Sequence, residues 1–182
     1  MIFTETKLKG MFIIELEKHK DERGFFARTW DQKKISEFGL NPKIVQCNIS
    51  FNKKKGTIRG MHYQIAPYEE AKLVSCTKGK IFDVAIDLRS KSKTFKEWIG
   101  SEISARNYNM LYIPEGFAHG FQTLEDNTEV FYQMSEFYMP EFARGIRWDD
   151  EAFQIKWPFK PPIISKKDLS FVPFKKRAVN HN

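Results

Sequence analysis

Two short motifs of this chain carry side chains that can move protons. The first reads R-G-M-H-Y-Q from Arg59 and is followed a few residues later by A-K, which ends at Lys72. The second reads I-P-E-G-F-A-H-G-F and places His119 after a proline and glycine turn. We expect His62 and Lys72 on neighbouring strands. Because imidazole titrates near neutrality and an ammonium can hold a developing enolate oxygen, this set suits proton abstraction beside a carbonyl better than metal binding.

Short β-strands are the elements that would position these side chains. Segments rich in Ile, Val, Phe and Tyr recur every eight to twelve residues and are separated by turn residues. One short helix is predicted over 31–38, with Asp31 as its N-cap and Gly39 after its end. Ten strands are predicted, over 11–16, 24–29, 43–49, 57–63, 72–78, 80–87, 98–103, 109–113, 119–123 and 129–135.

The pattern predicts an all-β protein with the double-sheet antiparallel jelly-roll form of the β-sandwich and a few short helices. This architecture covers the sheet faces with one core and leaves few free edges. Strands 72–78 and 80–87 are expected to form a hairpin around Lys78 and Gly79. Alternation within the second strand is typical of a half-buried strand, with Phe82, Val84 and Ile86 on one face and Asp83, Ala85 and Asp87 on the other.

Length indicates one domain, and the placement of the charge bears on the kind of partner. A chain of 182 residues with 41% hydrophobic content can bury one good core, so we expect a single domain over 1–182 in which the residues from about 140 wrap the core. The net charge of +7 is spread over short lysine runs, which argues against nucleic acid or a membrane as the partner. Two cysteines and the lack of a long apolar run favour a cytoplasmic protein.

Four motifs together resemble the dTDP-4-dehydrorhamnose 3,5-epimerase family, the deoxysugar-nucleotide epimerases of the cupin superfamily. They are R-G-M-H-Y-Q, K-L-V-S-C-T-K-G-K-I-F-D-V-A-I-D-L-R, S-x-T-F-x-x-W and I-P-E-G-F-A-H-G-F, and the similarity runs from about residue 2 to about residue 172. The resemblance implies a cupin jelly roll that epimerises a nucleotide-linked 4-keto-6-deoxyhexose at C3 and C5 without a cofactor. The expected conversion is dTDP-4-dehydro-6-deoxyglucose to dTDP-4-dehydrorhamnose.

Inversion of a carbon beside a ketone needs a base, a group that holds the enolate oxygen, and an acid on the other face. The resemblance assigns the base to His62, with Asp168 as the carboxylate that orients it. Lys72 and His119 are assigned to the enolate oxygen, and Tyr132 to the returning proton. The structural alternatives are a core histidine, a surface salt bridge for Lys72 and plain packing for Tyr132.

Binding residues for the nucleotide diphosphate follow from the same resemblance. Guanidinium groups suit phosphate oxygens, because their fork of donors matches two acceptors at once. Aromatic side chains can line the nucleobase or stack on it, although Phe26 can equally belong to the core. The resemblance assigns Arg23, Arg59 and Lys167 to the diphosphate, Gln46 and Asn48 to the nucleotide, and Phe26 and Tyr138 to the base.

Two positions depart from the family pattern. Arg28 stands where the rhamnose enzymes carry a glutamate that reads the thymine ring, and Ala143 replaces a second acidic residue. A cation in place of an acceptor changes which base edge can be read. The catalytic positions are intact, so we expect an active enzyme, and a C3-only epimerase acting on a GDP-, CDP- or UDP-linked sugar is the alternative.

Two rival functions use other features of the superfamily. A metal-dependent cupin would use a His-x-His pair, but Gln64 stands where the second histidine would be, so no metal is expected. A non-catalytic sugar-nucleotide binding module would lack the acid and base, which are present here. The resemblance also implies a homodimer in which the first strand joins the neighbour's sheet.

Overall fold

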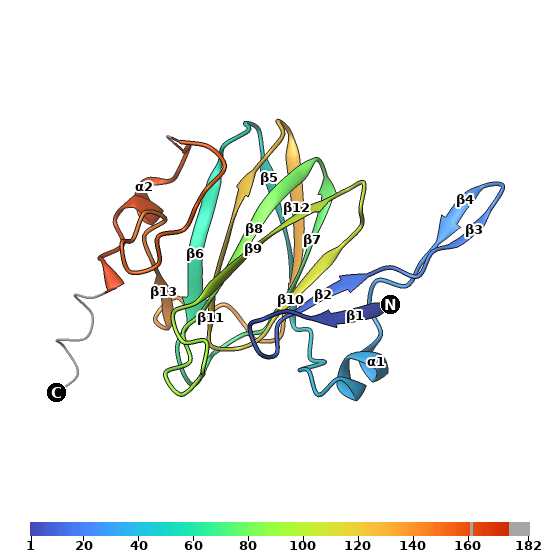
Figure 1. Ribbon diagram of the computed structural model, residues 1–182, viewed down its shortest axis with the longest axis horizontal. Helices are drawn as coiled ribbons and strands as arrows, with labels where there is room; N and C mark the ends of the chain where they lie inside the picture. The colour runs from blue at the N-terminus through green and yellow to red at the C-terminus, as the bar shows by residue number, and fades with distance from the viewer. Residues whose placement is uncertain (161, 175–182) are drawn as a thin grey trace.

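The computed structural model describes residues 1–160 and 162–174, in which two antiparallel β-sheets pack face to face (Figure 1). The predicted jelly-roll sandwich is thereby confirmed. The six-stranded sheet has the order β1 (Ile2–Glu5), β2 (Phe12–Glu15), β10 (Met110–Ile113), β7 (Lys72–Lys78), β12 (Thr128–Met134) and β5 (Gln46–Asn52). The five-stranded sheet has the order β13 (Ala143–Gly145), β6 (Ile58–Gln64), β11 (Phe117–Thr123), β8 (Lys80–Asp87) and β9 (Trp98–Ser104).

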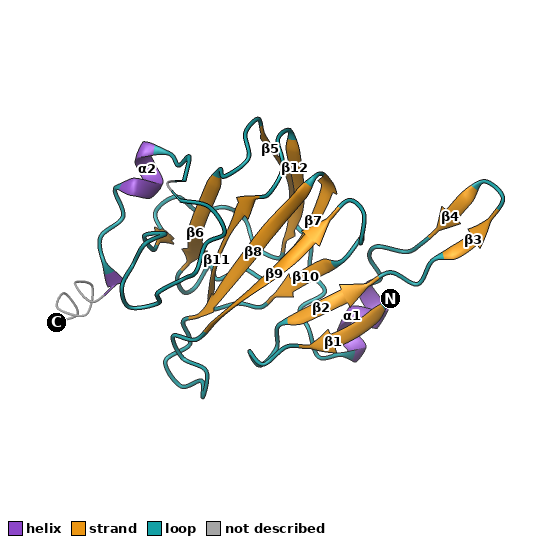
Figure 2. Cartoon of the chain, turned by 45° about the horizontal axis from the view of Figure 1, so that its top comes forward, coloured by secondary structure: helices purple, strands orange, loops and turns teal. Residues whose placement is uncertain are grey.

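The remaining elements are a hairpin and two short helices. Strands β3 (His19–Asp21) and β4 (Gly24–Phe26) form a two-stranded hairpin that projects away from both sheets (Figures 1 and 2). Helix α1 (Gln32–Glu37) begins as predicted, because the Asp31 side chain accepts a hydrogen bond from the Lys34 amide, and Gly39 follows its end with φ +70°. Each of the ten predicted strands overlaps an observed one, and β1 corresponds to the first strand that the family resemblance implies. Strands β3 and β13 and helix α2 (Lys166–Leu169) were not among the predicted elements.

The predicted hairpin around Gly79 is wrong, because β7 and β8 lie in different sheets. Gly79 has φ +77°, and a Cβ atom there would lie 2.5 Å from Oγ1 of Thr128, so the chain crosses between the sheets at a point where only glycine fits. The same crossing corrects the expectation that His62 and Lys72 lie on neighbouring strands. His62 is on β6 and Lys72 on β7, so they belong to opposite sheets.

A first apolar core fills the space between the sheets. Its buried members come from both sheets and include Val74, Ile81, Ala85, Leu111, Phe121 and Val130. Burial of these side chains is the main stabilising contribution to the sandwich.

A second core lies on the outer face of the five-stranded sheet. Phe153, Ile155 and Trp157, from the segment after β13, pack there against Val84 and Ile86 of β8. Strand β8 is therefore covered on both faces, and the prediction of a half-buried strand is wrong. Within the described residues the segment from about 140 lies along this sheet, and Figure 1 shows α2 beside β6; the last eight residues, 175–182, lie outside the described part.

A third core covers part of the outer face of the six-stranded sheet. Ile35 of α1 is fully buried there and packs in one cluster with Ile14, Leu73 and Tyr112. The backbone amide of Asn41, just beyond α1, donates a 2.8 Å hydrogen bond to the Tyr112 hydroxyl. The helix is thus held on the sheet by both apolar packing and a hydrogen bond.

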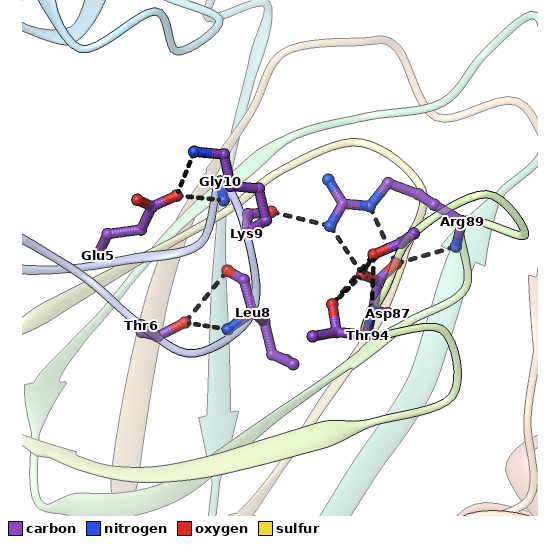
Figure 3. A network of polar contacts seen from close by, with 9 residues as sticks. Glu5, Thr6, Leu8, Lys9, Gly10, Asp87, Arg89 and Thr94 are labelled. Atoms are coloured by element: carbon purple, nitrogen blue, oxygen red, sulfur yellow. Dashed lines mark hydrogen bonds and ion pairs between the residues drawn. The ribbon is translucent and has the colours of Figure 1, made fainter.

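A polar network ties the β1–β2 turn to the loop between β8 and β9 (Figure 3). Arg89 donates to the Lys9 carbonyl over 2.8 Å and to both oxygens of Asp87, which also accepts hydrogen bonds from the Ser92 and Thr94 hydroxyl groups. Burial alone would raise the pKa of Asp87, but these donors outweigh it and lower the pKa to about 2. The Ser and Thr of the S-x-T-F-x-x-W motif thus donate hydrogen bonds to a buried structural carboxylate.

Candidate active site

A cavity of about 480 Å³ opens between the two sheets, with walls from β5, β6, β7, β12 and the segment beyond residue 137. A second cavity of about 300 Å³ adjoins it, because His62, Lys72 and Tyr132 line both. The second cavity also has Arg59 and His119 in its wall. Seven of the predicted site residues line the larger cavity, namely Gln46, Asn48, His62, Lys72, Tyr132, Tyr138 and Lys167.

His62 and Asp168 form a close pair at the cavity wall. Nε2 of His62 lies 2.7 Å from Oδ1 of Asp168, and the Asp168 side chain is 7% exposed, whereas that of His62 is 46% exposed. The Ser165 hydroxyl caps α2 by accepting a hydrogen bond from the Asp168 amide. This cap holds the Asp168 carboxylate beside β6. Burial works to raise the pKa of Asp168, but the hydrogen bond and charge of His62 and the Gly60 amide outweigh it and leave that pKa lowered. The pair presents an oriented imidazole to the cavity.

The two motif histidines face each other across paired strands. In the register of β6 and β11, His62 is directly opposite His119. A Cβ atom on Gly60, whose φ is +135°, would lie 2.5 Å from the Cα of Gly120, so these strands approach too closely for any other residue. The glycines of R-G-M-H and A-H-G-F therefore allow the two histidines to be adjacent.

His119 has its own carboxylate partner, which the sequence alone did not suggest. Its Nε2 lies 3.0 and 2.8 Å from the two oxygens of Asp83, and both side chains are buried. Burial raises the pKa of Asp83, although His119 and Lys72 act in the opposite direction. The alternation of β8 had assigned Asp83 to a solvent face, but that face points into the space between the sheets because residues 146–157 cover the other one.

Lys72 is buried in the cavity wall and paired with an acid. Its side chain is 8% exposed, and Nζ forms an ion pair and hydrogen bond with Oε1 of Glu70, whose side chain is 4% exposed. A surface salt bridge, the structural alternative for Lys72, is excluded by this burial. Glu70 was not among the predicted site residues, because an acid two positions before a lysine in an extended segment is a common surface pattern.

Tyr132 lies on the wall opposite His62. It is on β12 of the six-stranded sheet, between Asn48 of β5 and Val74 of β7, whereas His62 is on β6 of the five-stranded sheet. Burial raises the pKa of Tyr132, and the charge of Arg59 lowers it in part. The phenol therefore keeps its proton at neutral pH and is available as a donor.

The predicted nucleotide-binding residues divide between the cavities. The Tyr138 amide donates a 2.5 Å hydrogen bond to Gln46, and the Asn48 amide group lies 3.4 Å from the Met134 sulfur. Arg59 lines the second cavity, where its Nε donates a 2.7 Å hydrogen bond to Asn52. The structure therefore gathers these side chains around one cleft.

Basic groups also stand at the edge of the larger cavity. Lys167 of α2 lines it, as does Arg144 of β13, which was not predicted. Ala143, the second departure from the family pattern, lines the same wall. Positive charge from α2 and β13 therefore lies in the cavity wall, which favours an anionic ligand there.

Arg23, Phe26 and Arg28 are not brought to this cleft. Arg23 lies between β3 and β4, 90% exposed at its side chain, and pairs with Asp21 over 2.5 Å. Phe26, on β4, is 67% exposed, and Arg28 lies 3.7 Å from Asp31. None of the three lines either cavity, and the hairpin projects away from the site in Figure 2.

The described residues form neither a metal-binding cluster nor a membrane-spanning helix. Within residues 1–160 and 162–174, no group of three or more His, Cys, Asp or Glu side chains is arranged to hold a metal ion. In the same part of the chain, no helix is long and apolar enough to cross a membrane.

A jelly roll whose cleft carries a carboxylate-oriented histidine, a facing tyrosine and a buried lysine has the design of a cupin-class acid–base enzyme. A model of the family described as dTDP-4-dehydrorhamnose 3,5-epimerase matches residues 5–176. A dTDP-4-dehydrorhamnose 3,5-epimerase of Shigella flexneri is 44% identical over 167 residues, 91% of this chain and 92% of the relative. The chain belongs to the dTDP-4-dehydrorhamnose 3,5-epimerase family, and the class of enzyme predicted from the motifs is confirmed.

Solved structures agree with this assignment. The crystal structure of the 3,5-epimerase from Elizabethkingia anophelis has a TM-score of 0.94 at 39% identity, over 97% of this chain and 98% of that one. A Legionella pneumophila enzyme, in complex with dTDP-4-keto-L-rhamnose, has a TM-score of 0.87 at 37% identity, over 93% and 90%. A Streptomyces niveus relative, 32% identical over 88% of this chain and 78% of the relative, is a dTDP-4-dehydrorhamnose 3-epimerase.

Proposed function

We propose that the protein epimerises dTDP-4-dehydro-6-deoxyglucose at C3 and C5 to give dTDP-4-dehydrorhamnose. One observation carries this proposal. His62 and Tyr132 come from different sheets and line the same cavities, so a sugar ring between them would meet a base on one face and an acid on the other. Inversion at carbon needs removal of a proton from one face and its return to the other.

The residues would act in a fixed order. His62, oriented by Asp168, takes the proton from C3, and the electron pair of that C–H bond moves to the C4 carbonyl oxygen. Lys72 and His119 hold the resulting enolate oxygen, where loss of one such donor typically costs about 3 to 4 kcal/mol of transition-state stabilisation. Tyr132 then gives its proton to the opposite face of C3. Proton exchange with water restores His62 and Tyr132, the same steps follow at C5, and no cofactor takes part.

A dTDP sugar is favoured over other nucleotides by the relatives, which are named for dTDP substrates. Gln46, Asn48 and Tyr138 supply polar and aromatic surface for the base, and Arg59 and Lys167 supply charge for the diphosphate. The departures at Arg28 and Ala143 fall on positions that the resemblance assigns to nucleobase recognition, so the nucleotide preference has its own test. Binding of dTDP, UDP, GDP and CDP, measured side by side, should be tightest for dTDP, and tighter binding of another nucleotide would change the assigned substrate.

Solvent exchange tests the epimerisation. The enzyme is incubated in heavy water with the dTDP-linked 4-keto sugar, and NMR follows deuterium at each ring carbon. We expect label at C3 and C5, whereas no label at either carbon would contradict the proposal for this substrate. Tyr132→Phe should reduce net inversion more than exchange, because it removes the acid on one face and leaves the base on the other.

A C3-only reaction is the second candidate, and the 3-epimerase relative from Streptomyces niveus is the observation that favours it. The same experiment separates the two functions. Label at C3 alone, with none at C5 after prolonged incubation, would identify a 3-epimerase. The catalytic side chains named above would then serve a single inversion.

We also propose that the protein is a homodimer. Strand β1 is the outermost strand of the six-stranded sheet, which suits pairing with a second copy. Arg23 and Phe26 project on the β3–β4 hairpin away from their own cleft, so they can contact nucleotide only in the cleft of a partner subunit. Light scattering at micromolar concentration should give twice the chain mass of 21.5 kDa, and a monomer mass would contradict the dimer. The cytoplasmic location stays a prediction from the sequence.

A further inference from the structure

Glu70 is a buried acid in the cavity wall that the proposed proton path does not use. It is 6% exposed and lies two positions before Lys72, the spacing that puts two side chains on the same face of an extended chain. Oε1 of Glu70 receives the Lys72 ammonium. Oε2 is buried and has no hydrogen-bond partner among the described residues.

The carboxylate therefore has unused capacity to accept hydrogen bonds. An ionised carboxylate offers about four lone-pair sites, and Lys72 occupies one of them here. Glu70 and Lys72 both line the larger cavity, so this part of the wall offers a ligand an acceptor beside a donor. A ligand complementary to this wall carries a hydrogen-bond acceptor and a hydroxyl donor on adjacent atoms.

We propose that Glu70 binds the hydroxyl group next to the ketone of the sugar. An α-hydroxy ketone presents a carbonyl oxygen and a hydroxyl on neighbouring carbons, which matches the ammonium of Lys72 and the carboxylate of Glu70. In a 4-keto-6-deoxyhexose only C3, and not C5, carries a hydroxyl group beside the ketone. By binding the C3 hydroxyl, Glu70 thus sets the orientation of the sugar ring, with C3 on the Glu70 side of the ketone and C5 on the other. It also selects substrates that carry a 3-hydroxyl group. This inference rests on the proposed function.

A pair of substrates tests the inference without depending on C3 chemistry. The dTDP-linked 4-keto-6-deoxyhexose and its 3-deoxy counterpart both keep the C5 proton, so deuterium exchange at C5 can be followed by NMR for each. The readout is the ratio of the two kcat/KM values for exchange in each enzyme. Any change in Lys72 caused by the loss of its counter-ion affects both substrates and largely cancels in the ratio.

Wild-type enzyme should favour the 3-hydroxy substrate by about 10- to 100-fold, the usual effect of one hydrogen bond to a charged group. Glu70→Ala should reduce this ratio to near one. Glu70→Gln keeps the size of the side chain and one acceptor oxygen, so its ratio should lie between the two. If Glu70→Ala does not fold, Glu70→Gln decides alone, with a ratio lower than wild type by about threefold or more.

Glu69→Ala is the matched control, because Glu69 is exposed and lines neither cavity of the site. It should keep the wild-type ratio. A wild-type ratio in Glu70→Ala would overturn the inference and leave Glu70 as a counter-ion of Lys72. Absence of exchange from both substrates in wild-type enzyme would instead overturn the proposed function, and the inference with it, so the two failures are distinguishable.

Discussion

The two histidine–aspartate pairs of the cleft are chemically alike but lie in different surroundings. His62 and His119 are opposite each other on β6 and β11, and Nε2 of each lies within 3.0 Å of a carboxylate. The side chain of His62 is 46% exposed and lines both cavities, whereas that of His119 is 9% exposed and lines only the second. Access rather than residue type therefore separates the two histidines, because His62 is open to a ligand in either cavity and His119 is largely enclosed.

The carboxylates of the two pairs, Asp168 and Asp83, have pKa values shifted in opposite directions. Burial acts to raise the pKa of both, but hydrogen bonds and the charge of His62 outweigh it at Asp168, whereas burial prevails at Asp83. An ionised Asp168 stabilises the imidazolium that forms when His62 takes a proton. Environment thus distinguishes two pairs of identical residue types, a pattern that recurs where titratable groups divide acid and base work.

The largest expected effect is the loss of the base. His62→Asn keeps a polar side chain of similar reach but cannot accept a proton, so exchange at C3 and C5 should fall by about 10² to 10⁴. Deuterium incorporation followed by NMR measures the loss. A variant that exchanges at the wild-type rate would show that the more exposed histidine is not the base.

His119→Asn should have a smaller effect. If His119 holds the enolate oxygen, its loss should lower kcat by about 10² to 10³ and reduce exchange and inversion to the same extent. Steady-state kinetics and NMR on the same preparation compare the two. Loss of C3 exchange equal to that in His62→Asn would mean that the two pairs are not functionally distinct.

Stability should show the opposite ranking of the pairs. Asp83→Ala leaves the buried ring nitrogen of His119 without its partner, which should lower the free energy of unfolding by about 1 to 3 kcal/mol. Asp168→Ala affects a histidine that is half exposed and can bind water, so it should cost less than about 1 kcal/mol. Urea denaturation at pH 7 measures both, and equal losses would contradict the difference in burial.

The contrast between the pairs also shows what the sequence could predict. Most of the strands and helix α1 follow from local pattern, and motif resemblance assigns the proton-moving residues around His62. The side chain of Asp83 did not, because the alternation in β8 has the right period but does not say which face is covered. Val84 and Ile86 meet Phe153 and Trp157, more than sixty residues later in the chain, so the polar face points into the cleft.

Long-range geometry explains the other differences as well. Lys72 and His62 are close in sequence, but a crossing between the sheets puts them on opposite walls. The resemblance assigns Arg23 and Phe26 to ligand binding, but the hairpin takes them away from the cleft of their own chain. A motif can therefore indicate which residues belong to a site, but the fold determines which cleft their side chains line.

The smallest expected effect is a difference in how the two acids make stability depend on pH. The folded-state pKa of Asp168 is lowered, so its contribution to stability is complete above the ordinary value of about 4 and is lost as the pH falls through the lowered pKa. The folded-state pKa of Asp83 is raised, so its contribution is complete below about 4 and is lost as the pH rises through the raised pKa. The stability difference between wild type and Asp168→Asn should therefore shrink on acidification, whereas wild type should gain stability relative to Asp83→Asn.

Urea denaturation of the three proteins from pH 7 down to about 3 measures how each stability difference changes with pH. Slopes of the same sign would mean that the two carboxylates share one environment, which would remove the physical basis for giving the two histidines different roles.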